Sequence, residues 1–304
     1  MKKKNIIIAA SISLFFVVVS LFAMLPINNT YENGINPWMS YVEDNTKINE
    51  LTIPGTHDSG ATHSIFDVAG KCQDLTIEQQ LRIGTRFFDL RLQLIGEEFS
   101  IFHGPVDQGL KFDVVLNDLV NFVKEYDSEF LLISIKKEND DKNNTRSFKE
   151  VLTEKLNEYS EIISFSNEIP NTVKEARGKI YIIDRYGIDI GYPAYSNWVD
   201  DATFTLNNLY IQDDYCVNNA EEKITAIENT FNYSKENKGA YLYLNYSSCY
   251  FDNLFPPTYA GTAAYAINPW LINYLENDNY KSFGIVIVDF ITKDLAEIIY
   301  RRNY

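Results

Sequence analysis

Apolar runs alternate with amphipathic patterns along most of the chain. Several of the runs are nearly continuous, as expected for strands that are buried on both faces. Between them, apolar residues recur with the period of a helix. The runs predict strands at Ile48–Ile53, Arg86–Leu94, Ser100–His103, Phe130–Ile135, Lys179–Asp184, Leu209–Gln212, Ala240–Asn245 and Gly284–Phe290. The periodic segments predict helices at Ile77–Ile83, Leu116–Tyr126, Ser147–Tyr159, Glu221–Lys235, Pro269–Glu276 and Lys293–Arg302.

This alternation predicts an α/β protein with a parallel sheet. About eight strands lie in one stretch without an internal repeat or a low-complexity linker, which favours a single distorted (β/α)8 TIM-type barrel over two domains. The connection around Tyr186–Thr205 is aromatic and irregular, so the distortion is expected there. An open doubly wound sheet is the alternative, but no Gly-rich phosphate loop follows the first strand.

Residues 1–28 predict a signal peptide or an N-terminal membrane anchor. Lys2, Lys3 and Lys4 precede an apolar run from Ile6 to Leu25 that only serines interrupt. Cleavage after export is favoured, although the run approaches spanning length and no clean small-residue cleavage site follows it. Under either interpretation, residues 29–304 form a catalytic barrel outside the cytoplasm.

Composition indicates a globular protein with a large core, since 45% of its 304 residues are hydrophobic. The net charge is -15, and it becomes -18 without the three leader lysines, with 24 basic against 42 acidic residues. Such a body repels polyphosphate backbones, so nucleic acid is not expected as a partner. The three cysteines, Cys72, Cys216 and Cys249, match no zinc spacing, and buried or incidental thiols are the favoured interpretation.

Ionisable residues follow or end most of the predicted strands, and barrel enzymes build their sites at the carboxyl ends of strands. Two of the three histidines, His57 and His103, lie at such ends beside glycine-containing turns. Histidine can donate or accept a proton near neutral pH, so this pair predicts general acid–base chemistry. His63 lies past the first turn and is expected at the surface.

Arg91 follows Asp89 by two positions, so both side chains project from the same face of a strand. An inward-facing arginine needs an anionic partner, which is either a carboxylate such as Asp58 or a bound phosphoryl group. Asp289 follows an apolar strand and is expected to orient a histidine.

A metal site is the rival explanation of these carboxylates. Asp58, Asp89, Glu138 and Asp213 could supply oxygen ligands. However, Arg91 and Lys136 would bring positive charge to the same mouth, so we expect no metal and no other cofactor.

Seven segments of the chain form an ordered set of motifs. They are Ile53–Gly60 (IPGTHDSG), Arg86–Leu92 (RFFDLRL), His103–Pro105 (HGP), Ser134–Glu138 (SIKKE), Ala176–Lys179 (ARGK), Gln212–Tyr215 (QDDY) and Val286–Ile291 (VIVDFI). In this order and spacing they resemble bacterial phosphatidylinositol-specific phospholipase C, and the resemblance runs from about Trp38 to the C-terminus.

The resemblance implies a distorted TIM-type barrel and specific catalytic roles. His57 would be the general base toward the inositol 2-hydroxyl, oriented by Asp289. His103, assisted by Asp58, would be the general acid toward the diacylglycerol oxygen. Arg91 would bind the phosphate. The implied reaction releases diacylglycerol and inositol 1,2-cyclic phosphate from phosphatidylinositol.

The resemblance also implies how the substrate is held. Lys136, Arg185, Asp213 and Tyr215 would recognise inositol. A membrane-facing rim would include Tyr250, Phe251, Leu254 and Phe255, although these rings could instead pack their own loop. The expected partner is phosphatidylinositol at a membrane surface, for a monomeric protein; whether glycosylphosphatidylinositol (GPI) anchors are cleaved stays open. The alternatives are a metal-dependent glycerophosphodiesterase-like barrel and an inactive barrel that binds lipid or glycan.

Overall fold

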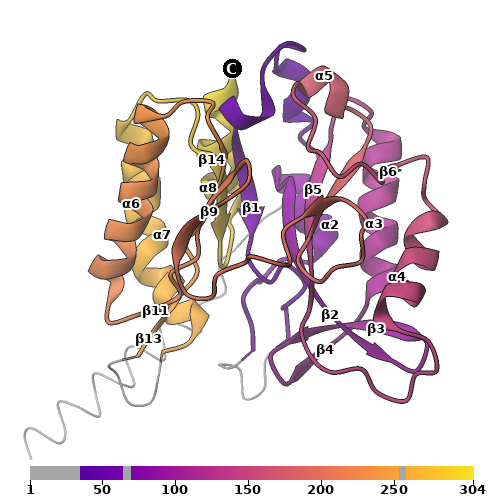
Figure 1. Cartoon of the computed structure of the whole chain (residues 1–304). Helices are drawn as coiled ribbons and strands as arrows, with labels where there is room; N and C mark the ends of the chain where they lie inside the picture. Colours follow the sequence, from indigo (N-terminus) through magenta and orange to yellow (C-terminus); the bar gives the residue numbers. More distant parts are fainter. Residues whose placement is uncertain (1–34, 64–69, 253–257) are drawn as a thin grey trace, which may run out of the picture. The chain divides into compact units, whose positions relative to one another are not determined.

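Seven parallel strands curl into a barrel wall, in which the first strand of the chain pairs with the last. The computed structural model describes residues 35–63, 70–252 and 258–304 (Figure 1). Strand β1 pairs with β14 from Thr52↔Gly284 to Thr56↔Val288, and the wall runs β7-β5-β2-β1-β14-β12-β10. The seven strands are β1 (Thr52–Thr56), β2 (Phe87–Ile95), β5 (Leu131–Lys137), β7 (Ile180–Asp184), β10 (Leu209–Gln212), β12 (Leu242–Tyr246) and β14 (Gly284–Val288).

The eighth position of the ring is only partly filled. Two-residue strands, β6 (Ile163–Ser164) and β8 (Tyr192–Pro193), pair in parallel with β7, while β9 (Thr203–Leu206) pairs antiparallel with β10. No backbone pairing joins β8 to β9 within the described ranges. The Tyr192 hydroxyl spans this seam, since it accepts from the Asn208 N–H at 3.0 Å and donates to the Leu206 carbonyl at 3.4 Å. The TIM-type barrel is therefore confirmed, and its distortion falls in the predicted connection.

Helices cover the outside of the wall. Figure 1 shows α6 and α7 beside the β10–β14 part of the sheet, and α3 and α4 beside β2 and β5. Among the described residues, no helix has both the length and the apolar character to cross a membrane. The helices are η1 (Trp38–Tyr41), η2 (Ile48–Glu50), α2 (Ile77–Ile83), α3 (Phe112–Glu125), α4 (Phe148–Asn157), α5 (Val173–Ala176), α6 (Ala220–Glu236), α7 (Ala260–Asn277), α8 (Lys293–Tyr300) and η3 (Arg301–Asn303).

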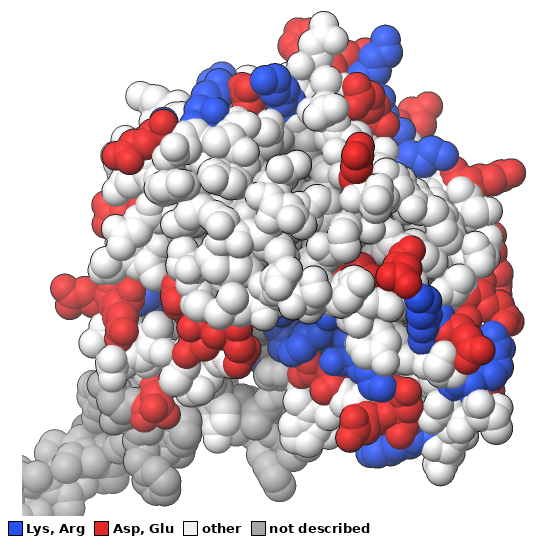
Figure 2. Space-filling view, viewed as in Figure 1, with Lys and Arg blue, Asp and Glu red and all other residues white. Residues whose placement is uncertain are grey.

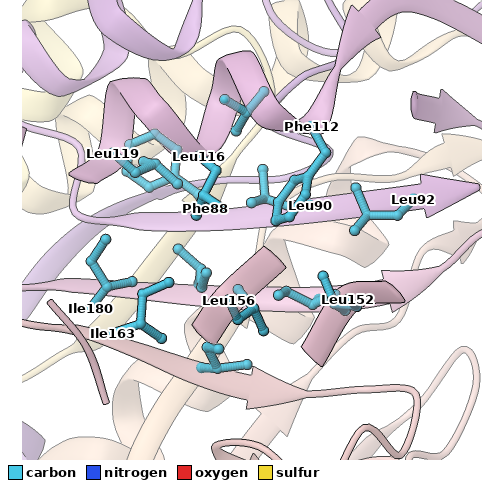
Figure 3. Close-up of a cluster of buried hydrophobic side chains, with 14 of the residues drawn as sticks. Phe88, Leu90, Leu92, Phe112, Leu116, Leu119, Leu152, Leu156, Ile163 and Ile180 are labelled. Atoms are coloured by element: carbon cyan, nitrogen blue, oxygen red, sulfur yellow. The ribbon is translucent and has the colours of Figure 1, made fainter. Parts of the chain in front are cut away.

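A large apolar cluster holds α3 and α4 against the sheet. Figure 3 shows Leu116 and Leu119 of α3 beside Phe88 and Leu90 of β2, and all four are 0–2% exposed. Burying each such side chain contributes about 1.5–3 kcal/mol relative to exposure. These strands are apolar throughout because both of their faces are buried, as the sequence pattern predicted.

One predicted barrel strand belongs to a different structure. Ser100–His103 lies in β3 (Glu98–His103), which is antiparallel to β2 and pairs onward with β4 (Val106–Lys111). The prediction of a barrel strand is therefore wrong. Strand β2 is nine residues long and extends beyond the wall, and its part from Leu92 to Ile95 pairs with β3. His103 nevertheless returns to the mouth, because β3 runs back along β2.

The starts of β1 and α7 also differ from the prediction. Ile48–Glu50 forms the 3-10 helix η2, so β1 starts at Thr52 and contains Pro54-Gly55-Thr56. Helix α7 starts at Ala260, nine residues before Pro269, which lies inside it instead of at its start. Proline at the first helical position is the commoner arrangement, which explains the short prediction.

Gly284→Ala is expected to lower the free energy of unfolding by about 2–4 kcal/mol. Gly284 has φ +79°, and a Cβ there would lie 2.5 Å from both the Cβ and the carbonyl oxygen of Tyr243. Gly96→Ala is the control, because Gly96 has φ +57° with open space around it, and its loss is expected to stay near 1 kcal/mol. Urea unfolding of both variants measures the difference; equal losses would contradict the clash.

Candidate functional site

His57 and Asp289 meet because of the register of β1 and β14. Thr56 pairs with Val288, so the next residue of each strand emerges at the same point of the mouth. The His57 Nδ1 and Asp289 Oδ1 atoms are 2.8 Å apart, and Asp289 is only 2% exposed. A buried carboxylate favours a proton on Nδ1, which leaves Nε2 free to accept one.

Arg91 contacts that second nitrogen of His57. Its Nη2 lies 2.6 Å from His57 Nε2, and since a guanidinium can only donate, Nε2 is the acceptor. Asp289, His57 and Arg91 thus form one chain of polar contacts across the ends of β14, β1 and β2. This order places His57 Nε2, and not Nδ1, against the Arg91 guanidinium.

Three carboxylates surround the Arg91 guanidinium. Its nitrogens lie 3.1 Å from Asp89 Oδ2, 3.7 Å from Asp58 Oδ2 and 3.8 Å from Glu138 Oε1. Burial raises the pKa of Asp89, but Arg91 and then Arg185 outweigh it and hold that pKa below its usual value. Arg91 thus has the anionic partner that an inward-facing arginine was predicted to need, and these contacts orient its guanidinium.

Asp58 is fully buried, with φ +40° in the turn after β1. Burial raises its pKa to about 7, although Arg91 and His57 both lower it. Its Oδ2 lies 3.9 Å from His103 Nε2. Burial, followed by the charge of Arg91, lowers the pKa of His103. Burial thus favours the neutral form of both side chains.

Asp58→Asn is expected to stabilise the fold at pH 8 by about 1–3 kcal/mol. The pKa of Asp58 is 3.8 in a reference peptide and about 7 in the folded protein. Stability is therefore retained below pH 3.8 and lost as pH rises to 7, because only the unfolded chain ionises freely in that window. The neutral amide removes this loss. Thermal unfolding of both proteins from pH 4 to 8 checks it; a difference that stays constant with pH would contradict the assignment.

The turn that carries His103 is held from β5. Glu138 Oε1 accepts from the Gly104 N–H at 2.7 Å, and Asn139 Nδ2 donates to the Gly104 carbonyl at 2.7 Å. Glu138 also lies 3.1 Å from Lys136 Nζ. Sequence reasoning considered Glu138 only as a metal ligand and missed Asn139, because β5 and this turn are far apart along the chain.

A cavity of about 460 Å³ brings the predicted residues together. Arg185 reaches from the end of β7 toward Asp89 at 3.5 Å and Asp213 at 3.9 Å. Of the predicted catalytic and inositol-binding residues, all but Asp58 line the cavity; they are His57, Arg91, His103, Lys136, Arg185, Asp213, Tyr215 and Asp289. His63 is exposed, as predicted.

The irregular connection after β8 adds two residues that were not predicted. The Trp198 ring lies 3.6 Å from the Arg185 guanidinium carbon, and Asp200 accepts from the Tyr215 hydroxyl at 2.9 Å. The stacking fixes the plane of Arg185. The aromatic residues of this connection could have indicated that it lies at the site. The contact of Trp198 with Arg185, however, depends on how the connection crosses the seam of the barrel.

The predicted rim is only partly described by the structure. Phe251 is 7% exposed in the short strand β13 (Tyr250–Phe251), paired with β11 (Cys216–Val217), so its prediction as an exposed wedge is wrong. Tyr250 is half-buried and lines the cavity. Leu254 and Phe255 lie outside the described residues, as does the predicted leader. Tyr259 and Tyr265 are exposed, at 40% and 78%.

Charges of both signs gather on the face of Figure 2. Basic and acidic side chains lie next to one another in its lower part, where Figure 1 has β2, β3 and β4. Neither sign forms an extended patch in this view, so an anionic ligand would be held by individual basic groups such as Arg91. The fold and the cavity define a barrel protein with a histidine–arginine site suited to a phosphate ester.

Comparison with known proteins names the family. Residues 50–186 match the family described as phosphatidylinositol-specific phospholipase C, X domain. A 1-phosphatidylinositol phosphodiesterase of Staphylococcus aureus is 30% identical over 275 residues, covering 83% of this chain and 87% of that protein. A protein of the same name from Listeria monocytogenes is 26% identical over 302 residues, covering 91% and 88%. The chain belongs to the bacterial phosphatidylinositol-specific phospholipase C family.

Solved structures agree with this assignment. The structure of the F249X mutant of phosphatidylinositol-specific phospholipase C from Staphylococcus aureus superimposes with a TM-score of 0.77 at 28% identity, covering 86% of this chain and 96% of that one. The enzyme from Listeria monocytogenes gives a TM-score of 0.72 at 24% identity, over 88% and 98% of the chains, and supports the fold.

Proposed function

We propose that this chain cleaves phosphatidylinositol by intramolecular transfer, with His57 as base, His103 as acid and Arg91 as phosphate clamp. The chain of contacts from Asp289 through His57 to Arg91 is the observation that carries the proposal. It brings the proton acceptor and the phosphate-binding cation to adjacent positions. The related proteins are named for a phosphodiesterase activity on this lipid, which supports the same substrate.

The first half of the reaction needs a base beside the phosphate. His57 Nε2 takes the proton of the inositol 2-hydroxyl, whose oxygen then bonds to phosphorus in the same molecule. Asp289 stabilises the resulting imidazolium through Nδ1–H. Without substrate, Arg91 donates to this same Nε2, so an arriving phosphate must draw the guanidinium away and thereby free the base.

The second half needs an acid for the leaving oxygen. As the bond from phosphorus to the diacylglycerol oxygen breaks, His103 gives that oxygen a proton. Burial lowers the pKa of His103, which alone would leave it mostly neutral. Asp58, whose pKa burial raises to about 7, lies 3.9 Å away and supplies the shared proton. The products are diacylglycerol and inositol 1,2-cyclic phosphate.

Positive charge at the phosphate is supplied by the protein in this mechanism. Arg91 lies within 3.8 Å of Asp58, Asp89 and Glu138, which are three of the four carboxylates that could have formed a metal cage. A divalent cation at that point would face the guanidinium directly. The attacking hydroxyl belongs to the substrate, so no metal-activated water is needed.

Recognition of inositol is assigned to four residues that line the same cavity. Lys136, Arg185 and Asp213 offer charged hydrogen-bonding groups, and Tyr215 offers a ring face for the sugar. Trp198 and Asp200 keep Arg185 and Tyr215 in place. We further propose that the protein is exported by its leader and acts as a monomer at a membrane surface, where Tyr250 and the exposed Tyr259 face the lipid. GPI anchors are a second substrate to be tested.

Phosphorus NMR of the products in EDTA tests the proposal. Phosphatidylinositol vesicles should yield the five-membered cyclic phosphodiester first, at a rate that EDTA does not change. Phosphatidylcholine vesicles are the control and should stay intact. Activity that disappears in EDTA and returns with calcium or magnesium would favour the metal-dependent glycerophosphodiesterase-like alternative. No product from any lipid would favour the inactive binding barrel.

A further inference from the structure

Cys72 lies between the two halves of the catalytic site. Its N–H donates to the Ala61 carbonyl at 2.8 Å, and its carbonyl accepts from the Phe290 N–H at 2.7 Å. These bonds join the segment to the turn that follows β1 and to the end of β14. The thiol is buried, yet Cys72 lines the cavity. The mechanism proposed above has no role for it.

Three metal-ligating groups converge at this thiol. Cys72 Sγ lies 3.9 Å from His103 Nδ1, and Sγ, one His103 nitrogen and one Asp58 oxygen all lie within 4.8 Å of one another. Both carboxylate oxygens of Asp58 are buried without a hydrogen-bond partner among the described residues. A buried carboxylate with unused oxygens, beside a thiol and an imidazole, is a donor set that zinc prefers.

We propose that Cys72, His103 and Asp58 form an inhibitory site for a soft divalent cation such as Zn²⁺. The thiol loses its proton to solvent on binding, and a cavity water completes the tetrahedron. Bonds of about 2.0–2.3 Å place tetrahedral donors roughly 3.4–3.7 Å apart, so the set must contract by up to about 1.4 Å. Rotation of the His103 side chain, which is 30% exposed, can supply this movement.

A second set that shares Cys72 is disfavoured by its histidine. His57, Cys72 and Asp289 also lie within 4.8 Å of one another. However, Asp289 and Arg91 already occupy both His57 nitrogens, at 2.8 and 2.6 Å. The contact of His103 Nδ1 with the thiol is longer, at 3.9 Å. Arg91 opposes a cation at Asp58 from 3.7 Å, and the added thiolate charge offsets this repulsion.

Inhibition follows from the roles of the ligands and therefore rests on the proposed function. A metal-bound His103 can no longer deliver a proton to the leaving oxygen, and Asp58 can no longer share one with it. Metal binding itself does not depend on that function. The two parts can be tested separately on the full chain.

Titration with Co²⁺ tests the site without an activity assay. The wild-type protein should show a thiolate-to-cobalt charge-transfer band in the near ultraviolet that saturates at one equivalent. Cys72→Ser should abolish this band. The double variant C216S/C249S is the matched control and should keep it. A band that persists in Cys72→Ser, or none in the wild type, would overturn the proposal.

The identity of the other ligands and the effect on turnover need two further measurements. His103→Gln should weaken Co²⁺ binding by about tenfold or more; unchanged affinity would overturn the proposed ligand set. Zinc should inhibit phosphatidylinositol cleavage reversibly with EDTA, and Cys72→Ser should raise the half-inhibitory concentration by about tenfold. An inactive wild type that still shows the cobalt band would contradict the proposed function and leave the metal site standing.

Discussion

His57→Ala is expected to lower kcat for release of inositol cyclic phosphate by about 10³- to 10⁴-fold. The variant removes the proton acceptor and leaves Asp289 as a buried carboxylate without its 2.8 Å partner. KM should change much less, because the residues assigned to inositol are all retained. Steady-state kinetics on phosphatidylinositol vesicles provides the measurement.

A second histidine provides the control for this experiment. His63→Ala is the matched control, because His63 is exposed and its backbone N–H, which the substitution retains, donates to Gln108 Oε1 at 2.8 Å. It should turn over at the wild-type rate. If His57→Ala did so too, the proposed base would be wrong. Thermal unfolding of each variant separates a loss of chemistry from a loss of fold.

Arg91→Lys is expected to lower kcat by about 10²- to 10³-fold although it keeps the positive charge. The guanidinium contacts His57, Asp89, Asp58 and Glu138 at once, and a single ammonium cannot reproduce this fork. The lysine would leave part of the buried carboxylate cluster without a donor. Its effect should therefore appear in kcat on a short-chain soluble substrate as well as on vesicles.

A surface arginine provides the comparison for this variant. The Arg146 side chain is 40% exposed, so Arg146→Lys should leave kcat unchanged. Near-wild-type turnover by Arg91→Lys would show that charge alone is enough at this position. The clamp of the proposed mechanism would then have to be replaced by general electrostatic attraction.

Much of the fold could be predicted because buried parallel strands and amphipathic helices carry strong patterns. The bounds of β10 and α2 were predicted to the residue, since both end at clear polar or glycine signals. Strand β4 was missed because its sequence, VDQGLK, alternates buried and exposed positions without a continuous apolar run. Whether Ser100–His103 joins the wall or a meander depends on pairing, which a local pattern does not contain.

The candidate site could be predicted where a residue follows a parallel strand or, like Arg91 in β2, lies within one. His57, Arg91, Asp213 and Asp289 meet because parallel strands end at one mouth. Trp198, Asn139 and Cys72 could not be predicted in the same way. Each lies in a loop, and its contact with the site depends on how that loop crosses the barrel, which neighbouring residues in the sequence do not determine.

The seam between β8 and β9 gives this barrel two strand edges that a closed ring would lack. An exposed edge can pair with a strand of another molecule and begin aggregation. Here β8 is two residues long and ends in Pro193, which has no N–H to donate. The Tyr192 hydroxyl already occupies the Leu206 carbonyl on the other side. The opening beside the Trp198 loop therefore leaves little free backbone with which a strand of another molecule could pair.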